Sequence, residues 1–98
     1  MKKIEVDLII DIGKSNVKFF IFKKNDGIIL KKKVFDNNFI FKKKNYLELD
    51  HKKLLNLIKK NIKSYISSYD LKSILPITHG SVAFLLDKNY KVLKSISD

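Results

Sequence analysis

The chain has 98 residues, 45% of them hydrophobic and 32% charged, which allows one domain with a modest core and argues against disorder. It has no cysteine, so disulfides and thiolate metal sites are excluded, and two histidines are too few for a histidine-built metal site. The net charge of +11 is typical of proteins that bind nucleic acid, but all 21 basic residues are lysine. Because bidentate recognition of phosphate and guanine prefers arginine, we keep a small lysine-rich nucleic-acid-binding domain only as an alternative.

The first ten residues do not resemble a targeting signal. Glu5 and Asp7 interrupt the apolar run that follows Met1, and no small-residue cleavage site comes after it. No window reaches the length of a membrane span. We therefore expect a cytoplasmic protein with no membrane partner, and the missing cysteines suit that reducing compartment.

The first third of the sequence predicts a three-stranded antiparallel meander. Residues 6–12 are almost continuously apolar and β-branched, as expected of a strand covered on both faces. A second strand is predicted over 16–23, and the Asp26-Gly27 dipeptide that follows it is a tight-turn signal. The third strand, about 28–35, carries three consecutive lysines, which suits an exposed sheet edge.

One helix dominates the middle of the chain. Residues 36–49 show no clean period and predict a loop, and Asp50 is a suitable N-cap for a helix over about 51–68. Lysines occupy one side of this helix, and its apolar residues recur at helical spacing on the other. These predicted core residues are Leu54, Leu55, Ile58, Ile62, Tyr65, Ile66 and Tyr69.

The last third predicts one more strand and a hairpin. Residues 72–78 read as a fourth strand that the helix returns to the sheet by a crossover, although Pro76 argues against a fully paired central strand. His79-Gly80 ends it. Residues 82–86 and 91–94, with a polar turn between them, then form the hairpin.

The stretch between the first two strands, DIGKSNVK at 11–18, has two interpretations. In the simpler one it is an ordinary turn, with Gly13 at positive φ and Ser15 or Asn16 bonding the local backbone. In the other it holds an anion. Asp11, at the carboxyl end of a strand, could then bind a magnesium ion or its water, and Gly13 would let phosphate approach the backbone.

The remaining side chains of this stretch suit phosphate. The amides of Lys14, Ser15 and Asn16 and the Ser15 hydroxyl would be donors to phosphate oxygens. Lys18 lies two residues beyond Asn16 on the same face of the second strand, where its ammonium could reach a terminal phosphate. Together the two strands would form a nucleotide clamp.

Residues 8–18, LIIDIGKSNVK, resemble the first phosphate-binding hairpin of the FGGY carbohydrate kinases, whose pattern is Asp-x-Gly-x-(Thr/Ser)-x-x-(Lys/Arg). A second segment, PITHGSVAFLLD at 76–87, resembles the family's HG…LLD segment. These kinases belong to the actin-like ATPase superfamily, whose domains have a ribonuclease H-like fold. The resemblance therefore implies an α/β fold, a partial ribonuclease H-like domain made of the meander, crossover helix, fourth strand and hairpin described above.

The resemblance also implies an activity and its site. It makes the chain the N-terminal portion of an ATP-dependent carbohydrate kinase, which phosphorylates a sugar or sugar-alcohol hydroxyl with ATP and magnesium. The matching positions are Gly13, Lys14, Ser15, Asn16 and Lys18 for the ATP phosphates, Asp11 for magnesium, and His79 and Gly80 for the sugar. From spacing alone, His79 could equally be a loop histidine at a strand end.

Family members are far longer, with two domains closing over a cleft. Residues 1–98 would thus be a single, incomplete domain, the first half of the family's first domain, with the second domain and the general base beyond it. We expect no catalytic base within this chain and little activity from it alone. It could be a truncated product, the first piece of a split gene that joins a separate C-terminal kinase piece, or a non-catalytic remnant.

Overall fold

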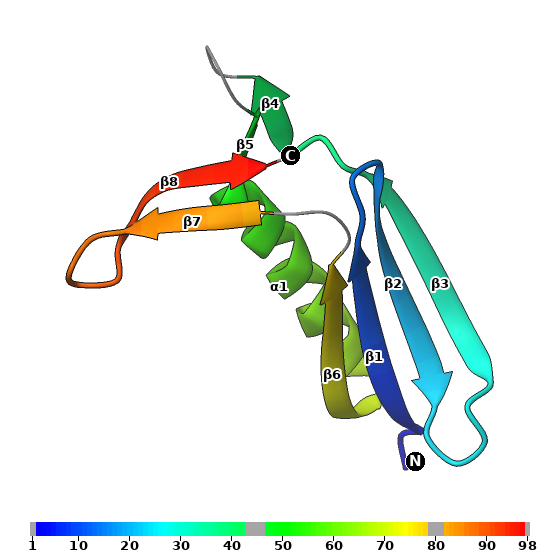
Figure 1. Cartoon of the computed structure of the whole chain (residues 1–98). Coiled ribbons are helices and arrows are strands. Elements are labelled where there is room, and N and C mark those ends of the chain that lie inside the picture. Colours follow the sequence, from blue (N-terminus) through cyan, green and yellow to red (C-terminus); the bar gives the residue numbers. More distant parts are fainter. Residues whose placement is uncertain (1, 43–46, 79–81, 98) are drawn as a thin grey trace.

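The computed structural model describes residues 2–42, 47–78 and 82–97 and forms two four-stranded sheets and one helix (Figure 1). The first sheet has the strand order β3-β2-β1-β6, and the second has the order β4-β5-β8-β7. Helix α1 lies behind the first sheet in Figure 1. The mixed α/β class predicted from the sequence is confirmed.

The N-terminal meander is confirmed almost residue for residue. Strands β1 (Glu5–Ile12), β2 (Asn16–Lys23) and β3 (Ile29–Asp36) pair antiparallel in sequence order. The second turn forms where Asp26-Gly27 predicts it. Gly27 has a φ of 72°, and the Ile28 amide donates to Asp26 Oδ1 at 3.1 Å. β3, with its three lysines, is an edge strand as expected.

Helix α1 (His51–Ser68) has the predicted bounds, and the Asp50 carboxylate accepts the Lys53 amide at 3.2 Å as its N-cap. The helix leads into β6 (Asp70–Thr78), which pairs parallel with β1, so the predicted crossover is confirmed. Pro76 is tolerated because β6 has a neighbour on one side only within the described chain.

The prediction of a loop over 36–49 is wrong. Two short strands, β4 (Ile40–Lys42) and β5 (Leu47–Leu49), pair antiparallel there. β5 in turn meets β8 (Val92–Ser97), which forms the predicted C-terminal hairpin with β7 (Val82–Leu86). A three-residue strand shows too little alternation to be recognised, and the second partner of β5, on β8, lies more than 40 residues away along the chain.

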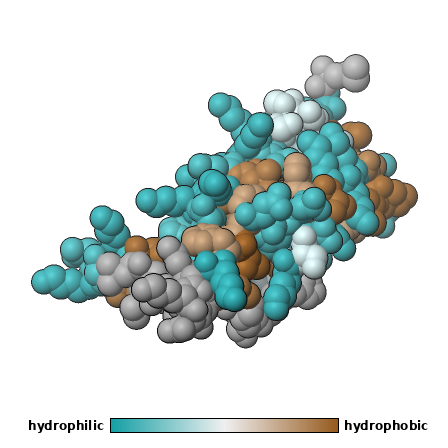
Figure 2. Space-filling view, turned by 90° about the horizontal axis from the view of Figure 1, so that it is seen from above, coloured by the Kyte–Doolittle hydropathy of each residue, from teal (hydrophilic) through white to brown (hydrophobic). Residues whose placement is uncertain are grey.

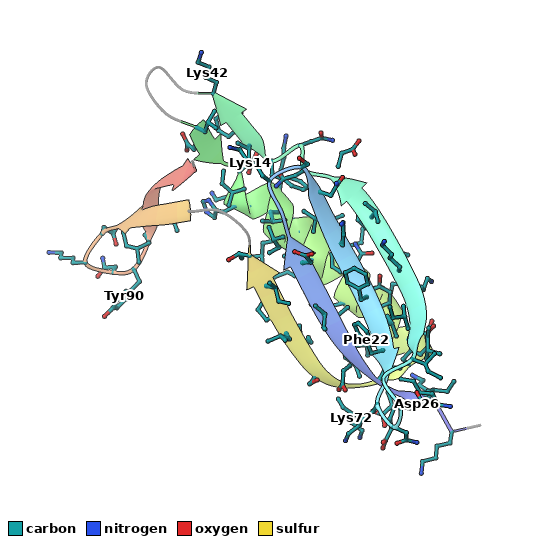
Figure 3. All side chains as sticks on the ribbon, turned by 45° about the vertical axis from the view of Figure 1, so that its right-hand side comes forward. Lys14, Phe22, Asp26, Lys42, Lys72 and Tyr90 are labelled. Atoms are coloured by element: carbon teal, nitrogen blue, oxygen red, sulfur yellow. The ribbon has the colours of Figure 1, made fainter. Side chains whose placement is uncertain are left out.

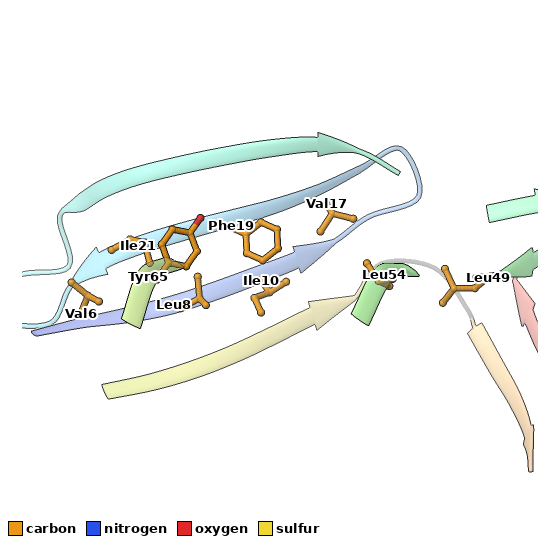
Figure 4. Close-up of a cluster of buried hydrophobic side chains, with 9 residues drawn as sticks. All are labelled: Val6, Leu8, Ile10, Val17, Phe19, Ile21, Leu49, Leu54 and Tyr65. Carbon is orange, nitrogen blue, oxygen red and sulfur yellow. The ribbon is translucent and has the colours of Figure 1, made fainter. Parts of the chain in front are cut away.

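The core lies between α1 and one face of the first sheet (Figure 4). Phe19 contacts Tyr65 of the helix, with ring centroids 6.3 Å apart. While the other predicted core residues are buried or partly buried, two are exposed, Leu55 at 47% and Ile66 at 53%. Each follows a buried residue by one position, about 100° around the helix, and only a narrow stripe faces the sheet. The buried cluster is Val6, Leu8, Ile10, Val17, Phe19, Ile21, Leu49, Leu54 and Tyr65.

The expectation that the first strand is covered on both faces is wrong within the described residues. Burial alternates along β1 and β2, and only the face toward α1 is sealed. The opposite face, which we call the open face, carries the alternate residues of the four strands. Its central row runs Leu75, Ile9, Phe20, Lys32 from β6 to β3, since these residues are register partners. Seen from above, hydrophobic surface emerges between hydrophilic side chains (Figure 2).

Candidate functional site

The turn between β1 and β2 is built from only three residues, 13–15, between the two strand ends. The Gly13 amide donates to the Asn16 carbonyl at 2.8 Å. A Cβ on Gly13 would lie 3.1 Å from that same oxygen, closer than ordinary van der Waals contact. The simple turn interpretation expected positive φ at Gly13, and this is wrong, because Gly27 is the only glycine with positive φ in the described chain. Gly13 instead allows the backbone of Asn16 to approach closely without a tight Cβ contact.

Asn37, directly after the end of β3, holds the turn. Its Nδ2 donates to the Gly13 carbonyl at 2.7 Å, and its backbone amide donates to the Ser15 carbonyl at 2.9 Å. Its Oδ1 accepts the Phe39 amide at 3.2 Å. Sequence reasoning placed Asn37 in a featureless loop and missed it. The signal was the polar run at 36–38 directly after a predicted strand, where Asx side chains commonly bond the backbone.

Asp11 and Lys18 face each other across the antiparallel pair. They are register partners, so both side chains project from the open face, and both are partly buried. Asn16 shares this face at the start of β2. Lys14 and Ser15 are exposed, and Figure 3 shows Lys14 at the tip of the hairpin, far from Asp26 at the other end of the sheet. The structure thus gathers Asp11, Gly13, Lys14, Ser15, Asn16 and Lys18 at one end of the first sheet.

His79 and Gly80, the predicted sugar-side residues, lie outside the described residues. The strand before them ends at Thr78, whose register partner on β1 is Ile12. The chain therefore leaves β6 beside the β1–β2 turn. Their assignment stays a prediction.

A groove of about 780 Å³ lies away from this turn, where the C-terminal end of α1 meets the start of β6. Lys72, in its wall, pairs with Asp70 at 3.1 Å and with Glu5 at 3.8 Å. The hydrogen bond and charge of Asp70, with a smaller contribution from Glu5, raise the pKa of Lys72 above its ordinary value of 10.5. Neighbouring acids thus partly neutralise this lysine, and none of the predicted site residues lines the groove.

The side chains near the β1–β2 turn can be compared with the ligands that a magnesium ion requires. Among the described residues, no three His, Cys, Asp or Glu side chains cluster as a metal cage. Magnesium in nucleotide sites commonly takes one or two carboxylates, several waters and the phosphate oxygens, so it needs no protein cage. A single carboxylate at Asp11, next to a turn with exposed polar side chains, fits that mode of binding.

The fold, compared with solved structures, matches two kinases over 99% of this chain. A carbohydrate kinase from Novosphingobium aromaticivorans superposes with a TM-score of 0.78 at 19% sequence identity. Glycerol kinase from Plasmodium falciparum, whose crystal structure was determined with ADP, superposes with a TM-score of 0.63 at 18% identity. The match covers 20% of the first kinase and 21% of the second. No family model and no curated protein matches the sequence.

These matches confirm, at the level of the fold, the resemblance to carbohydrate kinases that the two sequence segments indicate. The chain spans about a fifth of the length of the kinases it matches. None of the helices in the described part of the chain has the length and hydrophobicity that a membrane crossing requires.

Proposed function

We propose that this chain is the ATP-phosphate-binding portion of an ATP-dependent carbohydrate kinase, acting on a sugar or sugar-alcohol hydroxyl in the cytoplasm. One observation carries the proposal: the β1–β2 hairpin sets Asp11 directly across from Lys18, beside the tight Gly13–Asn16 turn, in a fold shared with two kinases. In this assignment the first sheet and α1 are part of a ribonuclease H-like domain.

Each residue has a defined task in this proposal. The Lys18 ammonium neutralises charge on the terminal phosphate, where phosphoryl transfer depends on positioning and charge stabilisation. Asp11 holds magnesium, directly or through water, and the bound ion would offset phosphate charge. Lys14, Ser15 and Asn16 supply donors at the turn, which Asn37 keeps in shape. His79 and Gly80 remain the proposed sugar-side positions.

We assign no general base to the described residues. The acids at 26, 50 and 87 bond turn or cap amides, and Asp7 accepts the Ser73 hydroxyl at 2.6 Å. We propose that the base and the opposing half of the cleft come from further kinase sequence, so the chain alone has little phosphotransfer activity.

The test is a calorimetric titration of the folded protein with ADP in the presence of magnesium. We expect saturable binding, weakened about tenfold or more by Asp11→Asn and by Lys18→Ala, because charge-assisted hydrogen bonds are worth about 1.5–3 kcal/mol. Removing magnesium should abolish the difference between wild type and Asp11→Asn while leaving the Lys18→Ala defect in place.

The matched controls are Asp26→Asn and Lys24→Ala, which change the same residue types. Asp26 lies at the opposite end of the first sheet (Figure 3), and Lys24 directly follows the end of β2. Both should bind ADP like wild type. Wild-type affinity in the Asp11 and Lys18 variants, or no ADP binding by protein shown to be folded, would disprove the phosphate site.

A further inference from the structure

The outward side of α1 is lined with lysines. Successive residues of a helix are about 100° apart, so the five lysines of α1 fall within an arc of about 120°. This arc lies opposite the buried stripe of Leu54, Asn61 and Tyr65, and all five lysines are exposed. They are Lys52, Lys53, Lys59, Lys60 and Lys63. The helix itself contains no aspartate or glutamate that would neutralise them.

The edge strand β3 extends this surface. Lys31 and Lys33 are the register partners of Ile21 and Phe19, which are buried in the core beneath α1, so both lysines project on the helix side of the sheet. The Lys33 Nζ lies 5.5 Å from the ring centroid of Tyr65 on α1. We call the five lysines of α1 and these two of β3 the lysine face.

The acids of the described chain lie around the lysine face. Asp50 caps α1 and lies 4.0 Å from Lys53 Nζ, and Glu48 lies on β5, two residues earlier. Asp26 pairs with a lysine at the end of β2, and Asp36 projects from the open face, since its register partner is at the start of β2. The remaining described acids are on β1, at the start of β6 and in the β7–β8 turn. Apart from Lys53, the lysines of this face form no ion pair within the described residues.

The chemistry of the lysine face restricts its partner to a polyanion. A second copy of the chain would be repelled. The chain has no arginine for bidentate base recognition, and the nearby rings of Phe35 and Tyr65 pack in or against the core, so unpaired bases have nothing to stack on. A membrane would require apolar side chains among the lysines, but Leu55 and Ile66 lie to one side of the arc, and Ile66 lines the groove beside β6.

A nucleic-acid duplex offers the complementary charge. Lys52 and Lys63 are about 16 Å apart along the helix axis, and a duplex carries roughly one negative charge per 1.7 Å of its own axis, so several phosphates lie within reach of the lysine face. Asn56 is exposed in the middle of the arc. Its amide can donate to and accept from a ribose 2′-hydroxyl, a group that DNA lacks.

We propose that the lysine face binds the phosphate backbone of double-stranded RNA, independently of base sequence. This function is additional to the proposed kinase function. Helix α1 lies on one side of the first sheet, and Asp11 and Lys18 project from the other (Figure 1).

The test is fluorescence anisotropy of a fluorescein-labelled RNA duplex of about 18 base pairs, titrated with the whole protein at several potassium chloride concentrations. We expect the logarithm of the affinity to fall linearly with the logarithm of the salt concentration, because each neutralised phosphate contributes a slope of about −0.9. A DNA duplex of the same sequence should bind about threefold more weakly, and Asn56→Ala should remove that difference. Amide chemical-shift changes in the wild type should be confined to α1 and β3.

A triple variant locates the surface. Lys52, Lys59 and Lys63 lie on one line along α1, within about 40° of each other. Replacing all three by glutamine should weaken RNA binding at least tenfold at about 0.1 M salt and make the salt slope shallower by about 2–3. Glutamine has a helix propensity close to that of lysine, so α1 is kept.

The matched control removes the same charge elsewhere. Lys32 projects from the open face, and Lys88 and Lys91 are exposed at the turn between β7 and β8. Replacing these three lysines by glutamine should change the RNA affinity less than threefold. Circular dichroism establishes that both triple variants are folded.

Several results would overturn the RNA proposal. Equal losses in the two triple variants would assign binding to net charge alone. Equal affinity for the DNA and RNA duplexes, or phosphatidylserine vesicles that bind where RNA does not, would assign the face to another partner. Chemical-shift changes centred on the β1–β2 turn would place the RNA at the proposed nucleotide site. ADP should not displace RNA from the wild type, and its titration tests the proposed function separately, since neither Asp11 nor Lys18 belongs to the lysine face.

Discussion

At the scale of single residues, the most unusual buried group is the Tyr65 hydroxyl. Tyr65 is 1% exposed, its ring packs on Phe19, and Lys33 Nζ lies 5.5 Å from its centroid. Within the described part of the chain the hydroxyl has no hydrogen-bond partner. A buried polar group in this state costs free energy that its ring contacts must offset.

We expect Tyr65→Phe to raise the free energy of unfolding by about 1–2 kcal/mol, because it deletes a buried, unsatisfied hydroxyl and keeps the ring. Urea denaturation at neutral pH measures this. The control is Tyr69→Phe, at a tyrosine that is only partly buried, with an expected change within about 0.5 kcal/mol. A net loss of stability in Tyr65→Phe would mean that the hydroxyl has a favourable partner.

Tyr65 also makes the free energy of unfolding depend on pH. Burial, with a smaller contribution from Tyr69, raises the pKa of Tyr65 above its ordinary value of 10.0. The folded state therefore keeps the phenol proton where the unfolded state has lost it, so this contribution is fully present below about pH 10 and declines as pH rises through the folded pKa. The stability difference between wild type and Tyr65→Phe should widen above about pH 10, because only the wild type carries this buried phenol.

At the scale of elements, the helix and the meander follow from local sequence. The helix has its apolar spacing and its Asp50 cap, and the turns at Gly13 and Asp26-Gly27 are short and locally determined. Strands β4 and β5 could not be predicted because each has only three residues, too few to show alternation, and because β5 also pairs with the distant strand β8. Likewise, the role of Asn37 depends on β3 lying beside β2, which places its side chain against Gly13.

We expect Asp50→Ala to lower the free energy of unfolding by about 1 kcal/mol, because it removes the acceptor for the Lys53 amide at the helix start. Asp50→Asn keeps a good capping oxygen and should lie within a few tenths of wild type. Parallel urea titrations of the three proteins measure this. Equal losses in both variants would assign the effect to charge, including the Lys53 ion pair at 4.0 Å, and not to capping.

At the scale of the whole molecule, the net charge affects the stability of the fold. With a net charge of +11 spread over lysines, the folded chain repels itself. Raising the sodium chloride concentration from about 0.05 to 0.5 M should raise the Tm by several degrees, because salt screens exposed charges. Replacing Lys59, Lys60 and Lys63, all exposed on α1, by glutamine should reduce that salt response. A Tm that does not respond to salt would show that self-repulsion is negligible.

The sequence predicts the right kind of fold, but its prediction for the coverage of β1 is wrong. It assigned β1 two covered faces from its apolar composition, whereas in the described chain α1 covers one. The hairpin brings the predicted site residues together, whereas what they bind depends on their side chains.

The parallel pairing of β1 with β6 also affects the order of folding. The meander joins neighbouring strands through short turns, but Glu5 and Asp70 must meet across more than 60 residues of intervening chain. Closing so long a loop is entropically slow, so the local hairpins form first and β6 docks after α1 has packed. During synthesis β6, with Ile74, Leu75 and Ile77 exposed, is therefore the last strand of the first sheet to gain its neighbour, and premature contact with other chains is most dangerous in that interval.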